Sequence, residues 1–319
     1  MNQAPLIQAQ SIGRSFSGRT VLRDVSFAVR QGEVLGFLGP NGAGKTTTMR
    51  ILTGTLAPTT GRVLVGDVDL AERPLLAKAR LGYLPEQPPV ARELSVDEYL
   101  DFCARLHRVP RARVRSARER AKALCGLGAV GRRLIGNLSK GYQQRVGIAQ
   151  AIVHEPQVVI LDEPTVGLDP LQIQEIRALI RDLGQHHSVI LSTHILPEVQ
   201  AVCTHVQIIR SGELVLRAAI DELAAHLAGT RLEVGLRRPP AAAALAALPG
   251  VSGVRAVGAD GRFELAYAAD TDPTDALVRA AVAQDWGLYE LRPPALSLEQ
   301  VFLELTQAAP SAPPEPVPA

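Results

Sequence analysis

A glycine-rich segment at residues 39–46 reads Gly-Pro-Asn-Gly-Ala-Gly-Lys-Thr, with the spacing G-x-x-x-x-G-K-T. An apolar run, 34–38, precedes it, and a run of helical character, 46–53, follows it. Between a strand and a helix, such glycines let backbone N–H groups turn toward phosphate oxygens, and the helix start favours an anion. The segment therefore predicts a nucleotide site. Its phosphate-contacting residues would be Gly39, Pro40, Asn41, Gly42, Ala43 and Gly44.

The residues that close this segment suit polyphosphate chemistry. Lys45 is expected to reach the β- and γ-phosphates, and the Thr46 hydroxyl is expected to ligate Mg²⁺. Thr47 follows closely enough to contact the α-phosphate. The alternative, a chance glycine-rich turn, does not account for the strand and the helix on either side.

Two adjacent carboxylates, Asp162 and Glu163, follow the apolar run 158–161. Because side chains alternate along a strand, both can face one site only if the strand ends there. We expect Asp162 to hold the Mg²⁺ shell and Glu163 to polarise the attacking water as the catalytic base. Taken alone, the pair also fits an ordinary strand end before Pro164, so its interpretation depends on the glycine-rich loop upstream.

These residues need a scaffold, and strands that alternate with helices predict an α/β fold with a parallel sheet. The apolar runs 34–38, 158–161 and 189–191 are the candidate core strands. Polar residues follow each run, at the carboxyl end where α/β folds bind ligands. The early runs 7–11 and 21–29 alternate more regularly and predict an antiparallel flank.

Between about residues 95 and 151 the pattern becomes helical. Ser95 and Glu98 have the spacing of a capping box and predict the start of one helix. A second helix is expected over 113–124, and a third after Ser139. This stretch predicts a helical subdomain inserted into the α/β domain.

The sequence pattern changes again after about residue 227. Residues 228–307 predict a small α+β domain, and no group of candidate catalytic residues is found in it. Its expected strands are 230–236, 251–257, 262–268 and 286–291, and its expected helices are 241–247, 273–284 and 298–306. The tail 308–319 is rich in Pro and Ala, a composition typical of disorder.

Composition limits the remaining possibilities. The chain has 319 residues, 46% hydrophobic and 21% charged, which is typical of a globular protein. Its net charge of +2 provides no electrostatic argument for nucleic acid or an acidic substrate. The three cysteines have no metal-ligand spacing and are expected to be reduced thiols. No secretion signal and no apolar stretch of the ~20 residues that cross a bilayer is evident, so a membrane role would need another chain.

Three further motifs narrow the class. Residues 138–145 read Leu-Ser-Lys-Gly-Tyr-Gln-Gln-Arg, residues 167–170 read Gly-Leu-Asp-Pro, and residues 192–194 read Ser-Thr-His. With the glycine-rich loop and the carboxylates, in this order, the chain resembles the nucleotide-binding subunits of ATP-binding-cassette (ABC) transporters over residues 5–227. The resemblance implies a P-loop NTPase core of the ABC ATPase type, with an antiparallel β flank and a helical subdomain.

The resemblance also implies roles for residues within one subunit. Phe16 would stack on adenine, although a core phenylalanine is the alternative. Gln87 would contact Mg²⁺, together with Thr46 and Asp162, and lie beside the docking site of a membrane subunit. His194 would hydrogen-bond the γ-phosphate, and it differs from an ordinary surface histidine in following a strand. Glu163, His194 and Lys45 would then be the catalytic residues.

Other implied roles need a second subunit. Ser139 and the backbone at Gly141 would bind the γ-phosphate of ATP held by the other protomer, and Asp169 would couple the two sites. The family's commonest signature is Leu-Ser-Gly-Gly-Gln, so Lys140 and Tyr142 are departures. Lys140 would meet the phosphate held by the partner or point to solvent, and the sequence leaves both open. This signature and the small C-terminal domain resemble the subgroup that serves ABC-2 type exporters, including gliding-motility-like ATPases.

A basic run extends over residues 105–122. A solvated face of the helical subdomain is one interpretation, and contact with anionic lipid headgroups is another. Nucleic acid is not expected, because no aromatic residues or binding motif accompany the run.

The sequence thus predicts an ATP-binding and ATP-hydrolysing subunit, with ATP and Mg²⁺ as cofactors, that energises an export-type ABC transporter. Its expected partners are a multi-spanning permease and a second ATPase subunit, identical or sister, because one chain has one phosphate loop and one signature. It is expected at the cytoplasmic face of the plasma membrane. The alternatives are a soluble ABC ATPase that remodels ribosomes or DNA, and a regulatory module that binds ATP without hydrolysis.

Overall fold

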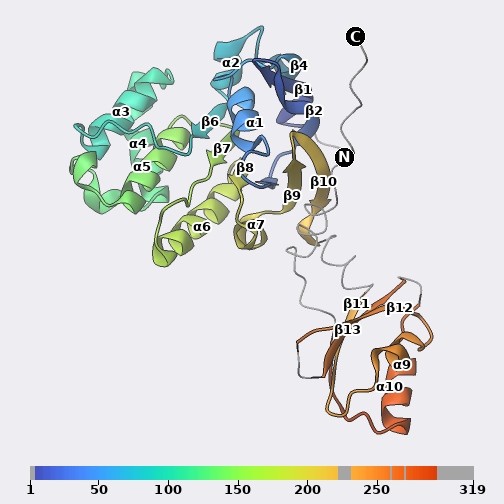
Figure 1. Cartoon of the computed structure of the whole chain (residues 1–319). Coiled ribbons are helices and arrows are strands. Elements are labelled where there is room, and N and C mark those ends of the chain that lie inside the picture. The colour runs from blue at the N-terminus through green and yellow to red at the C-terminus, as the bar shows by residue number, and fades with distance from the viewer. Residues whose placement is uncertain (1–3, 222–230, 259–260, 269–270, 293–319) are drawn as a thin grey trace, which may run out of the picture. The chain divides into compact units, whose positions relative to one another are not determined.

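The structure is a computed structural model in which residues 4–221, 231–258, 261–268 and 271–292 are described. These residues separate near Ala218 into two compact units. The larger unit contains the glycine-rich loop, the carboxylate pair and the helical stretch (Figure 1).

A six-stranded sheet forms the centre of the larger unit. Its strand order is β10-β9-β3-β8-β7-β6. The strand bounds are β3 Val34–Leu38, β6 Leu81–Leu84, β7 Val158–Asp162, β8 Ser188–Thr193, β9 His205–Arg210 and β10 Glu213–Ala219. The neighbours from β9 to β6 pair in parallel, so their carboxyl ends lie at one edge of the sheet. The expected parallel α/β core is confirmed.

Alternation of side chains along β7 divides the hydrophobic core into two. Val158 and Ile160 pack in the core that includes β1 to β5, whereas Val159 and Leu161 pack in the core that includes the helical region. Both faces of the strand are therefore covered, which explains why the run is continuously apolar.

The antiparallel flank is a second sheet, ordered β2-β1-β4-β5. Its strands are β1 Ile7–Phe16, β2 Arg19–Val29, β4 Thr60–Val65 and β5 Val68–Asp69. The first two are longer than the sequence predicts, since β-bulges let β1 continue past Ala9 to Phe16. Helices α1 (Lys45–Leu52) and α2 (Pro74–Lys78) belong to the same part of the unit (Figure 1).

The helical region contains α3 (Val96–Leu106), α4 (Val114–Leu124) and α5 (Lys140–Ile152). Helix α3 begins with the predicted capping box, in which Ser95 and Glu98 bond each other's backbone N–H groups. Two more helices, α6 (Pro170–Gly184) and α7 (Leu196–Val202), follow strands β7 and β8. None of the helices in the described part of the chain combines the length and the apolar character that crossing a bilayer requires.

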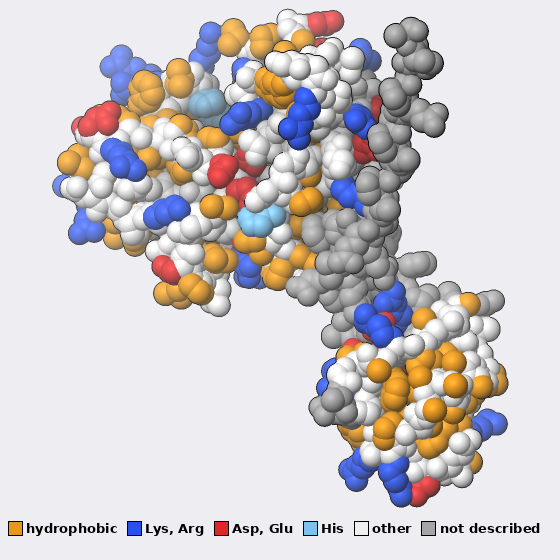
Figure 2. All heavy atoms as spheres, in the orientation of Figure 1, with side chains coloured by type: hydrophobic (Ala, Val, Ile, Leu, Met, Phe, Trp, Pro, Cys, Tyr) orange, Lys and Arg blue, Asp and Glu red, His pale blue; other side chains and the backbone are white. Residues whose placement is uncertain are grey.

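The smaller unit is a four-stranded antiparallel sheet, ordered β12-β13-β11-β14, with two helices. Its elements are β11 Arg231–Leu236, α9 Ala242–Ala246, β12 Val251–Ala256, β13 Arg262–Tyr267, α10 Thr274–Ala283 and β14 Leu288–Arg292. These match the predicted elements, whereas the predicted helix 298–306 and the tail 308–319 lie outside the described residues. Hydrophobic side chains, coloured orange, gather on the face of this unit that Figure 2 shows.

Candidate active site

A cleft of about 520 Å³ lies at the carboxyl ends of the parallel strands. Most of its lining belongs to the glycine-rich loop and the start of α1, and Glu163 and His194 complete it from the ends of β7 and β8. The lining residues are Val21, Asn41, Gly42, Gly44, Lys45, Thr46, Thr47, Glu86, Glu163, Val166 and His194. The fold thus brings together residues that are far apart in the sequence.

The loop needs glycine at two positions for different reasons. A Cβ on Gly39 would lie 2.4 Å from the backbone oxygen of Ile209, so the loop packs too closely on β9 for any side chain. Gly44 has a φ of 107° and caps the start of α1, a conformation that L-residues rarely adopt. The glycines therefore set the loop's path, which leaves the first turn of α1 facing the cleft.

Lys45 is the first residue of α1 and is only 6% exposed. Its Nζ donates to the carbonyl oxygens of Gly39 and Pro40, at 2.9 and 3.3 Å, and lies 3.4 Å from Oε1 of Glu163. The ammonium is therefore held inside the loop by its own backbone, where phosphate oxygens can reach it.

Asp162 ends β7 and is fully buried. The Thr46 hydroxyl donates to its Oδ1 at 3.4 Å, whereas its Oδ2 has no hydrogen-bond partner among the described residues. Burial, with a smaller contribution from the Glu163 carboxylate, raises the pKa of Asp162. A buried carboxylate oxygen without a partner, next to a threonine hydroxyl, fits a hard cation such as Mg²⁺.

This unsatisfied carboxylate leads to a stability prediction. We expect Asp162→Asn to raise the melting temperature of the ligand-free protein by about 2–4 °C, equivalent to ~1 kcal/mol, because it removes a buried charge. The raised pKa has the same sign: the wild-type deficit is complete above the folded-state pKa of Asp162, and it should shrink as the pH falls through that pKa toward the ordinary carboxyl pKa. Calorimetry of both proteins across pH checks this, and a lower melting temperature for Asp162→Asn at neutral pH would contradict it.

Glu163 has a positive φ of 49°, which is uncommon for a residue with a side chain. The strand ends at this turn, so the side chains of Asp162 and Glu163 no longer alternate. Both can therefore reach the cleft region, which the sequence predicts only for a strand that ends at this pair. Nδ1 of His194 lies 2.9 Å from Oε2 and 3.1 Å from Oε1 of Glu163. A buried carboxylate between a lysine and a histidine can accept a proton from a bound water.

Sequence reasoning missed three residues behind this pair. Glu198, in the first turn of α7, accepts hydrogen bonds from the hydroxyls of Thr165 and Thr193. In the sequence Glu198 is an acid near a helix start, which predicts a surface position rather than its 1% exposure. No sequence signal distinguishes it.

Six residues predicted to bind ATP or Mg²⁺ within one subunit do not line the cleft: Phe16, Gly39, Pro40, Ala43, Gln87 and Asp162. Phe16 is at the end of β1 and 42% exposed, with the Arg14 guanidinium 4.5 Å from its ring centre. It is therefore not the core phenylalanine that was the alternative. Gln87 is exposed in the loop after β6, where Glu86 and not Gln87 lines the cleft.

The signature residues also lie apart from the cleft lining. Ser139 caps α5 through its bond to the Tyr142 N–H, and Asp169 caps α6 through Gln172. A Cβ on Gly141 would lie 2.8 Å from the Gln172 side chain, so α5 and the start of α6 are in close contact. Lys140 is exposed, and a Cβ on Gly167 would lie 2.1 Å from its Nζ, so its ammonium lies against the loop before Asp169.

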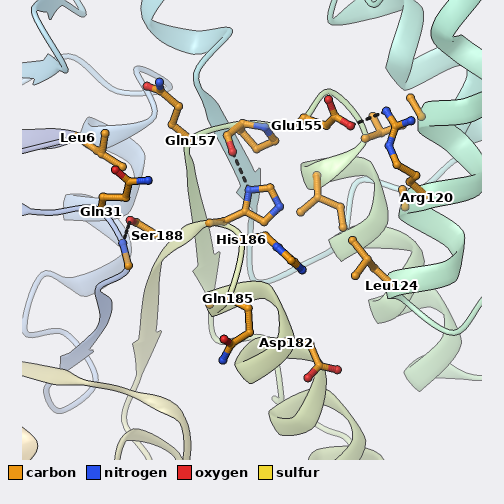
Figure 3. Close-up of a pocket in the computed structure, with 18 of the residues that line it drawn as sticks. Leu6, Gln31, Arg120, Leu124, Glu155, Gln157, Asp182, Gln185, His186 and Ser188 are labelled. Carbon is orange, nitrogen blue, oxygen red and sulfur yellow. Dashed lines mark hydrogen bonds and ion pairs between the residues drawn. The ribbon is translucent and has the colours of Figure 1, made fainter.

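A larger pocket, of about 1210 Å³, lies elsewhere in the unit (Figure 3). Its walls are α4, the end of α5, and the residues just before β7 and β8. Polar contacts connect its walls: the ion pair of Arg120 with Glu155, the bond of His187 Nδ1 to the carbonyl oxygen of Pro156, and the bond of the Gly32 N–H to Ser188 Oγ. None of its lining residues belongs to the glycine-rich loop or follows the carboxyl end of a parallel strand of the six-stranded sheet, so size does not identify the candidate site.

Comparison with known proteins agrees with this geometry. Residues 22–166 match the family model described as ABC transporter. The ABC transporter ATP-binding protein NatA of Bacillus subtilis is 37% identical over 63% of this chain and 83% of its own length. The daunorubicin resistance ATP-binding protein DrrA3 of Streptomyces coeruleorubidus is 32% identical over 92% of this chain and 93% of its own.

Among solved structures, cbiO1 of Clostridium perfringens, part of the ABC transporter complex cbiONQ, is similar at 27% identity. The TM-score is 0.64, and the match covers 70% of this chain and 92% of that one. The glycine-rich loop, the carboxylates, the signature and His194 thus occur in the order and on the fold of that family. The chain belongs to the ATP-binding subunits of ABC transporters.

Proposed function

We propose that this chain hydrolyses ATP in the cleft around the glycine-rich loop and that hydrolysis drives movement in a membrane partner. The observation that carries the proposal is the meeting of Lys45, Glu163 and His194 in one cleft, with Asp162 directly behind it. A lysine, a general base and a metal-binding carboxylate are the groups that phosphoryl transfer needs.

Each group has a distinct part in the reaction. The loop N–H groups and Lys45 hold the phosphates, and Glu163 accepts a proton from the attacking water. His194 orients Glu163 and hydrogen-bonds the γ-phosphate. Thr46 and Asp162 would hold Mg²⁺, with Gln87 as a further ligand, and the ion would neutralise phosphate charge during transfer. Phe16 offers an exposed ring for adenine.

The complete site requires a second subunit. Ser139, Gly141 and Asp169 do not line the cleft of their own chain, and Ser139 and Asp169 stand exposed at the starts of α5 and α6. They would contact ATP held by a partner ATPase subunit, so ATP binding closes the dimer and hydrolysis reopens it.

The names of two relatives support a membrane partner. DrrA3 is named for drug resistance, and the bacitracin transport ATP-binding protein BcrA of Bacillus licheniformis, 34% identical, is named for transport. We infer that this chain energises an exporter of the ABC-2 type from the cytoplasmic face of the membrane. Purification in mild detergent tests this: a multi-spanning permease should co-purify, and recovery of ribosomes or DNA instead would contradict it.

The basic run at residues 105–122 is a candidate for contact with the membrane surface. Its C-terminal part is neutralised within the protein, since Arg118 and Lys122 pair with Asp97 and Arg120 pairs with Glu155. Its N-terminal part is not: five exposed arginines form no ion pair or side-chain hydrogen bond with any described residue. This arginine cluster comprises Arg105, Arg108, Arg111, Arg113 and Arg115.

Two large apolar side chains accompany the cluster. Phe102 and Leu106 are 56% and 68% exposed and lie one turn apart on α3. Basic and apolar side chains side by side are typical of surfaces that bind anionic bilayers. At the end of α3, His107 stacks on His154, which bonds the carbonyl oxygen of Leu81 at the start of β6. The end of α3 therefore lies near the start of β6, at the strand ends opposite the nucleotide cleft.

We expect the purified protein to co-sediment with phosphatidylglycerol vesicles, weakly with phosphatidylcholine vesicles, and less at high salt. The triple change R105Q/R108Q/R111Q should weaken this binding by about a hundredfold, at ~1 kcal/mol per charge. The control R19Q/R73Q/R181Q removes the same charge from exposed positions elsewhere. Equal losses of vesicle binding in both triple variants, or equal binding of the wild type to both lipids, would contradict a lipid-binding role. The arginine cluster would then be an ordinary solvated surface.

A further inference from the structure

Glu198 is a buried carboxylate that connects the two loops of the candidate active site. The Thr165 hydroxyl donates to its Oε1 at 2.5 Å, and the Thr193 hydroxyl donates to its Oε2 at 2.8 Å. Thr165 follows Glu163 by two residues, and Thr193 directly precedes His194. Each oxygen of one carboxylate is therefore attached to a different loop, and each loop carries one member of the Glu163–His194 pair.

Burial and further hydrogen bonds hold the two threonines in place. Thr165 is 3% exposed and Thr193 is fully buried, at the end of β8. Thr193 Oγ1 also accepts the Ile195 N–H at 3.0 Å, so it fixes the backbone on both sides of His194. On the other side, the Glu163 N–H donates to the carbonyl oxygen of Ser192 at 2.9 Å. Glu198 thus completes a ring of hydrogen bonds around the pair.

The charge of Glu198 has a physical consequence. Both hydroxyls donate, so the carboxylate acts as an acceptor at both oxygens, and such charge-assisted bonds are short and strong. The Arg177 guanidinium contributes a longer ion pair, with Nη2 at 4.0 Å from Oε1. With 1% exposure, Glu198 has the two hydroxyls as its hydrogen-bond donors at close range, which holds the threonines in place.

Glu198 does not line the nucleotide cleft, so we do not expect it to contact ATP directly. We propose that Glu198 is a positioning residue for hydrolysis, which sets the distance between Glu163 and His194 through Thr165 and Thr193. The proposal rests on the function proposed above. A misplacement of about 1 Å between reacting groups can cost on the order of 100-fold in rate, which is the scale on which such a residue acts.

The test is the ATPase kinetics of Glu198→Gln, Thr165→Val and Thr193→Val. Each should lower kcat by about 10- to 100-fold, with KM for ATP within about threefold of wild type, because the phosphate loop is untouched. Glu198→Gln combined with Thr193→Val should lose little more than the worse single variant, since both changes break one network. Thr193→Ser keeps the hydroxyl and should retain most of the activity.

Glu33→Gln is the matched control. Glu33 is also buried, at 8% exposure, and accepts the Arg30 N–H, but it precedes β3 at the strand ends away from the cleft. It should change the melting temperature without lowering kcat. Equal kcat for Glu198→Gln and wild type, or parallel losses of kcat in Glu198→Gln and Glu33→Gln, would overturn the proposal. Absence of hydrolysis in the wild-type protein would instead overturn the proposed function.

Discussion

Glu163→Gln is expected to keep ATP binding and to lose about 10³-fold in kcat, the scale of a general base. Glutamine keeps the shape of the side chain and can still accept a bond from Lys45, but it cannot take a proton from water. Glu163 is 7% exposed and lies 2.9 Å from His194 Nδ1 and 3.4 Å from Lys45 Nζ. Both neighbours hold the carboxylate in the cleft.

The same variant should accumulate as a closed dimer. If hydrolysis reopens the dimer, a chain that binds ATP without turnover remains closed, and size-exclusion chromatography with ATP should show the doubled mass. Lys45→Ala is the control, since it should remain monomeric for lack of ATP. If Glu163→Gln hydrolysed ATP at the wild-type rate, Glu163 would not be the general base. His194 would then be the next candidate.

The second large effect is complementation between two inactive variants. Lys45→Ala removes the cation that the loop carbonyls hold, and Ser139→Ala removes the α5 cap that should meet the partner's phosphate. Alone, each homodimer has two damaged sites. In an equal mixture, roughly half of the dimers combine both variants and contain one intact site, so roughly a quarter of wild-type activity should return.

Steady-state ATPase assays of subunits mixed after reversible dissociation measure this recovery. The control mixture combines Lys45→Ala with Glu163→Gln, two changes on the same side of the site. Its mixed dimers contain no intact site, so their activity should stay low. Activity of the first mixture no higher than that of its components would contradict a homodimer with shared sites and favour a sister subunit as the partner.

Much of the fold followed from local patterns. The continuously apolar runs at β3 and β7 reflect strands covered on both faces, and the Ser95–Glu98 box marks the start of α3. Segments with strong periodicity or caps carry this information locally. The length of β1 was underestimated, because its bulges depend on pairing with β2 and leave no mark in the alternation of its own residues.

The candidate site divides in the same way. The phosphate loop, Asp162, Glu163 and His194 were predictable because each follows a recognisable strand. The role of the basic run was not, since only the fold shows that Arg118, Arg120 and Lys122 meet carboxylates while the arginine cluster meets none among the described residues. The position of Lys140 over Gly167 also depends on the contact between two helix starts.

The glycine-rich loop and the carboxylate strand are thus properties of the sequence itself. Their chemistry lies in residue types at fixed spacing, and backbone geometry alone turns that spacing into a phosphate cradle. The burial of Glu198 and its bonds to two threonines are decided by the tertiary structure. An acid at a helix start is ordinarily solvated, and only the packing of α7 against the ends of β7 and β8 buries it and aims both oxygens at threonines. Burial is a property of the whole fold, so the residue that joins the two loops becomes visible only there.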